Sequence, residues 1–232
     1  MQNSIQILCT RPLNESLIDE AKQVGITIDE LSFIETEPIQ SIEIQQEIEQ
    51  AFLLTTTVVF TSMNAVEAVA FYQEENQPAW KIYCIGNTTN KLVSNYFGED
   101  KITGTANDAT ELAMLIAEDE NTKEVIFFCG DLRRDELPAI LRNSGIDVNE
   151  IVVYQTTTVP HKISKNYHGI LFFSPSAAVS FFQQNKLPAT TILFAIGNTT
   201  ANEIKKYTIN KIIISDEPGK ENLVKKMMEY FT

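Results

Sequence analysis

Short, uninterrupted apolar runs alternate along this chain with segments in which apolar residues recur at spacings of three and four. Such runs are typical of strands buried on both faces, and the longer spacing is typical of a helix with one face in a core. Regular alternation of strand and helix predicts parallel sheets with right-handed crossovers. We expect strands at 5–9, 58–60, 81–85, around 102, and at 125–129, 170–173, 192–196 and 211–214, each followed by a helix.

Two segments interrupt the alternation. Leu31–Ile39 and Ile151–Val159 read as extended chain, end at or beside Pro38 and Pro160, and lead into no immediate helix. We interpret both as linkers between two lobes.

The chain also repeats itself at nearly constant spacing. Two matches lie 112 and 111 residues apart, and a third, weaker one lies 120 residues apart. Two related α/β halves with polar loops at matching places predict a cleft lined from both sides. Taken alone, the repeat suggests a division near residue 120. The matches are Val58–Val66 with Ile170–Val179, Ile85–Thr89 with Ile196–Thr200, and Cys9–Arg11 with Cys129–Asp131.

Length and composition agree with this organisation. A chain of 232 residues suits two domains of about 100 residues each. Its start lacks the basic residues of a signal peptide, and no stretch reaches the roughly 18 to 20 apolar residues that span a bilayer. We therefore expect a soluble cytoplasmic protein that is not bound to a membrane.

Charge and cysteine content narrow the functional classes. The formal net charge of −13 argues against a general binder of nucleic acid or anionic membranes. A small anionic ligand remains compatible, because charges more than about 8 Å apart in solvent are largely screened at physiological salt. The three cysteines are widely spaced beside apolar runs, which predicts small buried side chains and neither a disulfide framework nor a metal site.

Four polar loops fall where expected strands end and helices begin, the edge at which open parallel sheets bind ligands. Serine, threonine and asparagine there are first of all helix caps, and for one loop alone capping is the better interpretation. Four such loops, two in each half of the repeat, favour an anion site, since helix N-termini carry partial positive charge and free donors. Gly86 and Gly197 stand alone, so no phosphate-loop or dinucleotide motif is present. The candidate binding residues are Thr61, Ser62, Asn64, Gly86, Asn87, Thr88, Thr89, Ser174, Ser176, Gly197, Asn198, Thr199 and Thr200.

Cationic and hydroxyl side chains add further candidates. Arg133 and Arg134 follow Gly130 at another strand-to-helix turn, and Thr10-Arg11 occupies the matching turn of the first half. Solvated arginines and arginines paired with an anionic ligand fit this pattern equally well. Tyr154 lies in the second linker, where its hydroxyl could donate a hydrogen bond at neutral pH, although a structural tyrosine is common. Neither of the two histidines has a nucleophile motif nearby, which leaves a hydrolase triad without support.

Seven segments, in order and spread from Thr10 to Ala201, resemble the uroporphyrinogen-III synthase family. The resemblance implies an α/β fold of two parallel-sheet lobes, HemD-like with flavodoxin-like topology, joined by a two-stranded β ladder with a cleft between them. It places residues 1–33 and 161–232 in one lobe, 41–150 in the other, and 34–40 and 151–160 in the linker strands. The segments are Thr10–Pro12, Phe60–Val66, Ile85–Thr89, Cys129–Arg134, Val153–Thr156, Phe173–Ser176 and Ala195–Ala201.

The implied activity is that of a cofactor-independent lyase of heme biosynthesis. It would cyclise hydroxymethylbilane, which carries eight carboxylates, to uroporphyrinogen III with loss of water and inversion of the terminal pyrrole ring. The resemblance makes Tyr154 the candidate that assists departure of the hydroxyl as water. It also implies no metal. We further expect a monomer, with transient handover of substrate from the preceding pathway enzyme.

Two positions depart from the family pattern. Phe173 stands where the first half has Thr61, and Gly219 stands where the family often has a hydroxyl residue, with Asp216 and Glu217 just before it. Two other classes of function stay open: a two-lobed protein that binds an anionic small molecule without chemistry, and a flavodoxin-like electron carrier. The carrier would bind flavin and be yellow as purified.

Overall fold

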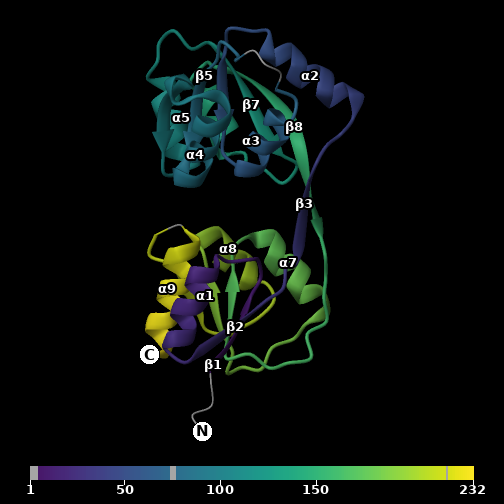
Figure 1. Ribbon diagram of the computed structural model, residues 1–232, viewed down its shortest axis with the longest axis vertical. Coiled ribbons are helices and arrows are strands. Elements are labelled where there is room, and N and C mark those ends of the chain that lie inside the picture. The colour runs from purple at the N-terminus through teal and green to yellow at the C-terminus, as the bar shows by residue number, and fades with distance from the viewer. Residues whose placement is uncertain (1–4, 74–76, 218) are drawn as a thin grey trace. The chain divides into compact units, whose positions relative to one another are not determined.

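The chain divides into two compact units. The computed structural model describes residues 5–73, 77–217 and 219–232. Unit 1 comprises the chain up to Glu35 together with Thr157–Thr232, and unit 2 comprises Thr36–Thr156. The chain passes between the units twice, within strand β3 (Ile34–Pro38) and within strand β8 (Asp147–Thr158) (Figure 1).

Unit 1 is a five-stranded sheet in the order β2-β1-β9-β10-β11, with every pair parallel. Helices α1 and α9 pack on one face of the sheet, and α7 and α8 pack on the other. The elements are β1 Ile5–Cys9, α1 Glu15–Gln23, β2 Ile26–Glu30, β9 Gly169–Phe172, α7 Pro175–Gln184, β10 Ile192–Ala195, α8 Asn198–Ile204, β11 Ile212–Ile214 and α9 Lys220–Phe231.

Unit 2 is a six-stranded sheet in the order β3-β8-β7-β4-β5-β6, parallel from β8 to β6. Helices α2, α3 and α4 cover one face, and α5 and α6 cover the other. The elements from α2 onward are α2 Ile42–Phe52, β4 Thr57–Phe60, α3 Met63–Ala70, β5 Lys81–Ile85, α4 Gly86–Phe97, a 3-10 turn at Glu99–Lys101, β6 Ile102–Ala106, α5 Ala109–Ala117, β7 Glu124–Gly130 and α6 Glu136–Asn143.

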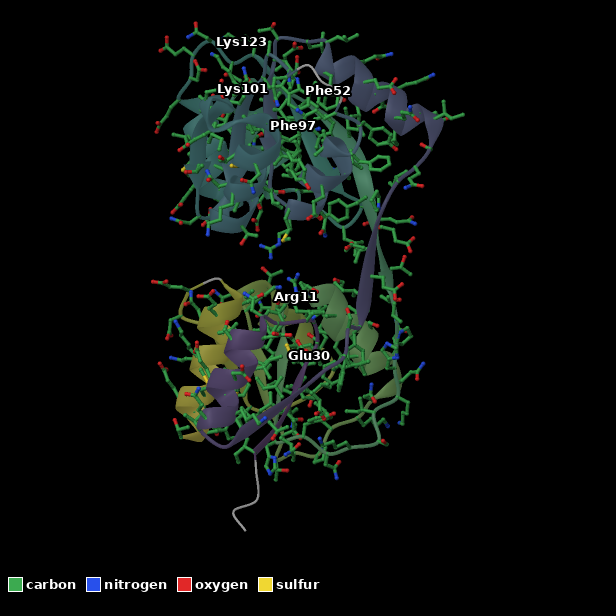
Figure 2. The ribbon with its side chains drawn as sticks, in the orientation of Figure 1. Arg11, Glu30, Phe52, Phe97, Lys101 and Lys123 are labelled. Carbon is green, nitrogen blue, oxygen red and sulfur yellow. The ribbon has the colours of Figure 1, made fainter. Side chains whose placement is uncertain are left out.

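Aromatic residues fill the core of unit 2 beneath α2 and α4. The Trp80 indole stacks on Phe52 at 4.8 Å between ring centroids and donates its N–H to the carbonyl of Ala51 at 2.9 Å. Phe97 packs against Trp80 and Phe60. Figure 2 labels Phe97 and Phe52 in this part of unit 2. This interior satisfies the one polar atom of the indole, so a large aromatic side chain is buried without an unpaired donor.

The two sheets have the same spatial order when strands are matched through the sequence repeat. Strands β4, β5, β6 and β7 correspond to β9, β10, β11 and β1. The order across the sheet is β6-β5-β4-β7 in unit 2 and β11-β10-β9-β1 in unit 1, so corresponding strands occupy corresponding places. Each unit therefore combines one part of the first repeat with one part of the second. A division near residue 120, which the repeat alone suggests, is wrong, because Thr36–Thr156 is one compact unit.

Three elements differ from the sequence predictions. Strand β2 and helix α2 lie where no strand or helix was expected, and α2 begins three residues after Ile39, capped by the Ser41 hydroxyl, which accepts from the Ile44 N–H at 3.3 Å. Strand β8 begins at Asp147, and its buried residues Ile151 and Val153 belong to the core of unit 2. The segment expected as a linker at 151–160 is thus largely a continuation of a sheet strand.

Strand β3 pairs with β8 as an antiparallel ladder. The Ile39 N–H donates to the Val153 carbonyl and the Val159 N–H to the Phe33 carbonyl, both at 2.9 Å, so residue numbers run in opposite directions along the two strands. The three cysteines are free and buried. Within the described residues, none of the helices is both long and apolar enough to cross a membrane.

Candidate active site

Each sheet has one place where the order of its strands reverses. In unit 2 the chain runs outward from β4 to β5 and β6 and returns to the other side of β4 with β7, so the reversal lies between β4 and β7. In unit 1 it lies between β9 and β1. Loops that diverge at such a point leave a crevice beyond the carboxyl ends of the strands, which is the usual binding position in open α/β sheets.

Tyr154 lies at the reversal point of unit 2. It sits on β8 opposite Gly130, the last residue of β7, where the register shifts between Cys129 and Gly130. Its hydroxyl donates to the Ser62 Oγ, which follows β4, at 3.1 Å. The structure thus brings together three candidates from positions 62, 130 and 154.

Gly130 makes this placement possible by lacking a side chain. A Cβ atom built on Gly130 would lie 2.4 Å from Cζ of Tyr154 and 2.7 Å from its hydroxyl oxygen. Such approaches are far inside van der Waals contact, so the tyrosine ring occupies the space that any side chain at 130 would need. Gly130 is therefore a wall of the site as well as the last residue of β7.

Ser62 links the tyrosine to helix α3. Its Oγ accepts from the Asn64 N–H at 3.2 Å, which makes Ser62 the N-cap of α3. With Tyr154 and Asn64 both donating to this oxygen, the serine proton is free to be donated to a third group. Burial raises the pKa of Tyr154 above its ordinary value, so its hydroxyl stays protonated at neutral pH. Two hydroxyl donors in contact can supply a proton to a leaving oxygen.

The other polar loops follow one pattern in both units. Thr88 and Thr199 are exposed in the first turns of α4 and α8, whereas Thr89 and Thr200 are buried. Neither helix has a side-chain N-cap among the described residues, which leaves backbone N–H donors for a ligand. That both threonines of each loop belong to a ligand-binding loop stays a prediction, in which Thr89 and Thr200 have little exposed side-chain surface to offer. Of the remaining loop residues, Gly86 begins α4, Gly197 is the N-cap of α8 and Asn198 its first residue. Thr61 precedes Ser62, Asn64 follows it by two positions, and the side chain of Asn87 lies outside the described part of the chain.

Hydroxyls at the reversal point of unit 1 are mostly engaged within the fold. Ser174 caps α7 by accepting from the Ala177 N–H at 3.1 Å, and its Oγ lies 3.0 Å from that of Ser176. Thr10 is 1% exposed, and its hydroxyl donates to the Leu171 carbonyl at 2.8 Å. Thr10 therefore joins β1 to β9 through its side chain, and its role in substrate binding stays a prediction.

The arginines divide into paired and unpaired groups. Arg133 forms ion pairs with Glu150 and Asp135, and Glu150 also accepts from Arg142 at 2.6 Å. The charge of Arg133 is thus balanced inside unit 2, which opposes the expected role in holding an anionic ligand. Arg134 is exposed, and Arg11 is half-buried with its guanidinium 6.0 Å from the centre of the Phe173 ring. No ion pair of either is found within the described residues.

Sequence reasoning missed Lys220, the first residue of α9. Its Nζ donates to the Pro12 carbonyl at 3.3 Å, which brings it to the loop that carries Arg11. The signal for it was weak, because a lysine after a glycine in a loop rich in acids looks like ordinary solvated surface. Asp216, one of those acids, pairs with Lys226 at 2.6 Å.

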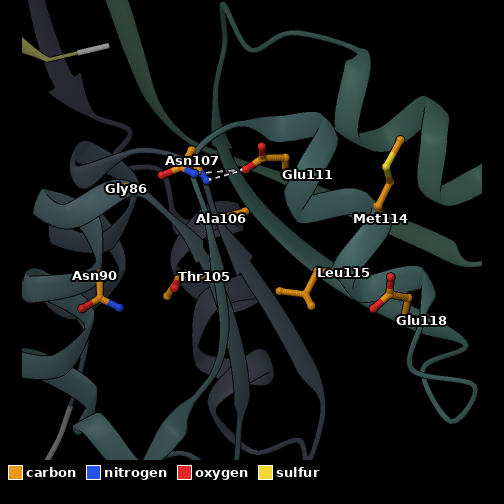
Figure 3. Close-up of a pocket in the computed structure, with 9 residues that line it drawn as sticks. All are labelled: Gly86, Asn90, Thr105, Ala106, Asn107, Glu111, Met114, Leu115 and Glu118. Atoms are coloured by element: carbon orange, nitrogen blue, oxygen red, sulfur yellow. Dashed lines mark hydrogen bonds between the residues drawn. The ribbon is translucent and has the colours of Figure 1, made fainter. Parts of the chain in front are cut away.

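A separate pocket of about 760 Å³ lies in unit 2 between α4, β6 and α5 (Figure 3). Among its lining residues are Gly86, Asn90, Glu111 and Glu118. Asn107 donates to Glu111 from its backbone at 3.1 Å and from its side chain at 3.3 Å. Two carboxylates on its wall make this pocket a poor site for an anionic ligand, despite its size.

Comparison with known proteins identifies what the chain is similar to. A family model described as uroporphyrinogen-III synthase HemD matches residues 15–225. A uroporphyrinogen-III synthase of Saccharomyces cerevisiae is 25% identical over 174 residues, 62% of this chain and 62% of that protein. The chain thus spans somewhat under two thirds of the length of this curated relative.

Solved structures extend the likeness to the fold. Uroporphyrinogen-III synthetase from Helicobacter pylori superposes with a TM-score of 0.66 at 19% identity, covering 97% of this chain and 99% of the other. A mutant uroporphyrinogen III synthase from the extremely thermophilic bacterium Thermus thermophilus also gives 0.66, at 12% identity, with 97% and 98% covered. The α/β fold of two parallel-sheet lobes predicted from the sequence is confirmed.

Proposed function

Because the chain belongs to the uroporphyrinogen-III synthase family, we propose that it catalyses the reaction for which the family is named. Hydroxymethylbilane would lose water from its hydroxymethyl group, and the terminal pyrrole ring would invert before closure to uroporphyrinogen III. The observation that carries this proposal is the family match over residues 15–225. The chemistry of the site supports it, since a protonated hydroxyl at the reversal point of unit 2 suits a step that expels water.

In this mechanism Tyr154 acts as the general acid. Its hydroxyl, or the Ser62 hydroxyl to which it donates, gives its proton to the departing oxygen as the C–O bond breaks, so that water leaves in place of hydroxide. Loss of the pyrrole N–H proton then returns a proton to the acid. Assistance of this kind is typically worth 10²- to 10⁴-fold in rate. No redox step or external nucleophile is needed, because the pyrrole ring supplies the electrons that expel the water and later the carbon that closes the ring.

Binding relies on donors distributed over the helix N-termini. Each unit by itself offers donors for carboxylates of the substrate: unit 2 has the uncapped first turn of α4, the exposed Thr88 and the exposed Arg134, and unit 1 has the uncapped first turn of α8 and the exposed Thr199. Direct closure to the wrong isomer needs no catalyst and therefore competes with ring inversion. A protein that restrains the flexible linear tetrapyrrole favours inversion by hindering that direct closure. The protein would thus contribute mainly through positioning.

A coupled isomer assay tests the proposal. Hydroxymethylbilane is generated in place, the products are oxidised, and type III and type I isomers are separated by chromatography. We expect mostly type III product that depends on this protein. Type I product alone would contradict the synthase, and ligand binding without turnover would favour a non-catalytic protein that binds an anionic small molecule.

We also propose that the enzyme works as a cytoplasmic monomer that receives its substrate from the preceding pathway enzyme. Three free, buried cysteines fit a reducing compartment. Light scattering of the purified protein measures its mass against the 26.1 kDa of one chain. Cell fractionation tests its location, and a dimer or a membrane-bound pool would contradict this part of the proposal.

A further inference from the structure

Two cations without matching carboxylates meet at the carboxyl end of β1 in unit 1. Arg11 follows β1 directly, and Lys220 opens helix α9 and donates to the carbonyl of Pro12, the residue after Arg11. Both side chains are half-buried. Within the described residues neither forms an ion pair, although Lys220 contacts a carbonyl oxygen.

The surroundings hold Arg11 in place without neutralising it. The central carbon of its guanidinium lies 6.0 Å from the centre of the Phe173 ring, which is at the outer range of a cation–π contact. Phe173 in unit 1 thus presents an aromatic ring to Arg11. The position that the repeat matches to it in unit 2, Thr61, carries a hydroxyl instead. Figure 2 labels Arg11 and Glu30 in unit 1, where Glu30 is the exposed last residue of β2 and pairs in register with Cys9 at the end of β1.

One carboxylate lies near the two cations. Glu30 accepts from the Leu13 N–H and acts on Lys220 through space. Burial lowers the pKa of Lys220, and the neighbouring Arg11 lowers it further; burial also lowers the pKa of Arg11. The single carboxylate of Glu30 thus faces the two positive charges of Arg11 and Lys220, so the cluster carries an excess of positive charge. An added anion would relieve this imbalance and would also meet the backbone N–H donors at the start of α9, which has no side-chain cap among the described residues.

We propose that Arg11 and Lys220 together form a carboxylate-binding site in unit 1, which holds one acidic side chain of the substrate. The proposal rests on the proposed function for the identity of the ligand, but the chemistry of the site is set by the two cations. Arg11 supplies planar, bidentate donors and Lys220 a mobile point charge. The pairing of Asp216 with Lys226 reduces the opposing charge of that acid.

The test uses the full-length protein and its variant Lys220→Gln, with Lys225→Gln as matched control. Lys225 is exposed on the same helix, so its replacement removes the same charge away from the site. Two quantities are measured: KM and kcat for hydroxymethylbilane, and the Kd of the oxidised type III product, which carries the same eight carboxylates and cannot react. Lys220→Arg tests rescue by retained charge, and thermal melting tests a purely structural role.

We expect Lys220→Gln to raise KM and Kd about tenfold with kcat within about twofold of wild type, the effect of removing one charge-assisted hydrogen bond. Lys220→Arg should regain most of the affinity, and Lys225→Gln should leave both constants within about twofold. Unchanged KM and Kd in Lys220→Gln would overturn the site, as would a loss that follows the melting temperature or appears equally in Lys225→Gln.

The two proposals fail separately. If no type III product forms but the probe binds and Lys220→Gln weakens it, the carboxylate site stands and the synthase proposal falls. If type III product forms and Lys220→Gln behaves as wild type, the synthase proposal stands and the site falls. A wild-type protein that neither binds the probe nor forms product would overturn both.

Discussion

Replacing Gly130 with alanine should displace the Tyr154 side chain and so impair its function, although Tyr154 itself is unchanged. Gly130 is not among the glycines with positive φ, so alanine can adopt its backbone conformation and the obstacle is only the added methyl group. That Cβ would lie 2.4 Å from Cζ of Tyr154, against ordinary contacts that begin at 3.4 Å. The ring must therefore retreat by about 1 Å, which is enough to break the 3.1 Å hydrogen bond to Ser62.

The expected loss is large in rate and moderate in stability. A misplacement of about 1 Å at a reacting group can cost roughly 10²-fold, so we expect kcat of Gly130→Ala to fall by that order. Overpacking of this kind typically costs about 1–3 kcal/mol of unfolding free energy. The assay is initial-rate formation of type III product with hydroxymethylbilane in excess, alongside urea unfolding.

A double-mutant cycle with Tyr154→Phe separates the two effects. Phenylalanine keeps the ring that alanine would strike but lacks the hydroxyl, so Gly130→Ala should lower stability equally in both backgrounds. It should lower kcat only where the hydroxyl is present, with less than about twofold further loss in Tyr154→Phe. Equal losses of kcat in both backgrounds, or an unchanged kcat in Gly130→Ala, would refute the role assigned to Gly130.

Three further outcomes follow from the structure. Tyr154→Phe alone should reduce kcat by at least about tenfold with little change in melting temperature, and full activity would remove this hydroxyl from the mechanism; Tyr96→Phe, on the exposed surface of α4, is the control. Ser62→Ala removes both the cap of α3 and the partner of Tyr154, so it should lower stability by about 1 kcal/mol and also reduce kcat, and loss of stability alone would leave Ser62 a cap only. The free energy of unfolding should also fall above about pH 9. Burial raises the pKa of Cys9 to about 12 and that of Cys84 to about 11, whereas thiols of the unfolded chain ionise near 9.0. The unfolded state therefore releases these protons first as the pH rises and gains stability relative to the folded state. Urea unfolding at about pH 8 and about pH 10.5 measures the fall, and Cys84→Ala should make it shallower; an identical slope would contradict the assignment.

The strands buried on both faces could be predicted from the sequence because their apolar runs are uninterrupted. Strands with one exposed face gave no such signal. In β2, Ile26 and Ile28 are buried while Thr27 between them is exposed, and the first residues of β8 alternate in the same way. A search for continuous apolar runs misses this pattern, since the period of two carries the information there.

The candidate site was predictable as a set of loops but not as a set of contacts. The repeat and the strand ends locate Ser62 and Gly130, yet the hydrogen bond from Tyr154 joins residues 92 positions apart and depends on a register shift between Cys129 and Gly130. Pairing of Arg133 with Glu150 likewise requires α6 and β8 to be packed against the end of β7. Side-chain partners of this kind follow from tertiary packing and leave no local trace.

The interleaving of the two units has a consequence for biosynthesis of the chain. Residues 36–156 are contiguous, so unit 2 can fold as soon as they have left the ribosome, whereas β1 at Ile5–Cys9 must wait for β9 at Gly169–Phe172. Strand β1 is thus made before unit 2 but completed after it, against the usual N-to-C order of domain folding. Until then the apolar residues of β1, Ile7 and Leu8, have a partner strand on one side only. Ribosome-bound chains that end between about residues 160 and 200 would accordingly be the most dependent on chaperones.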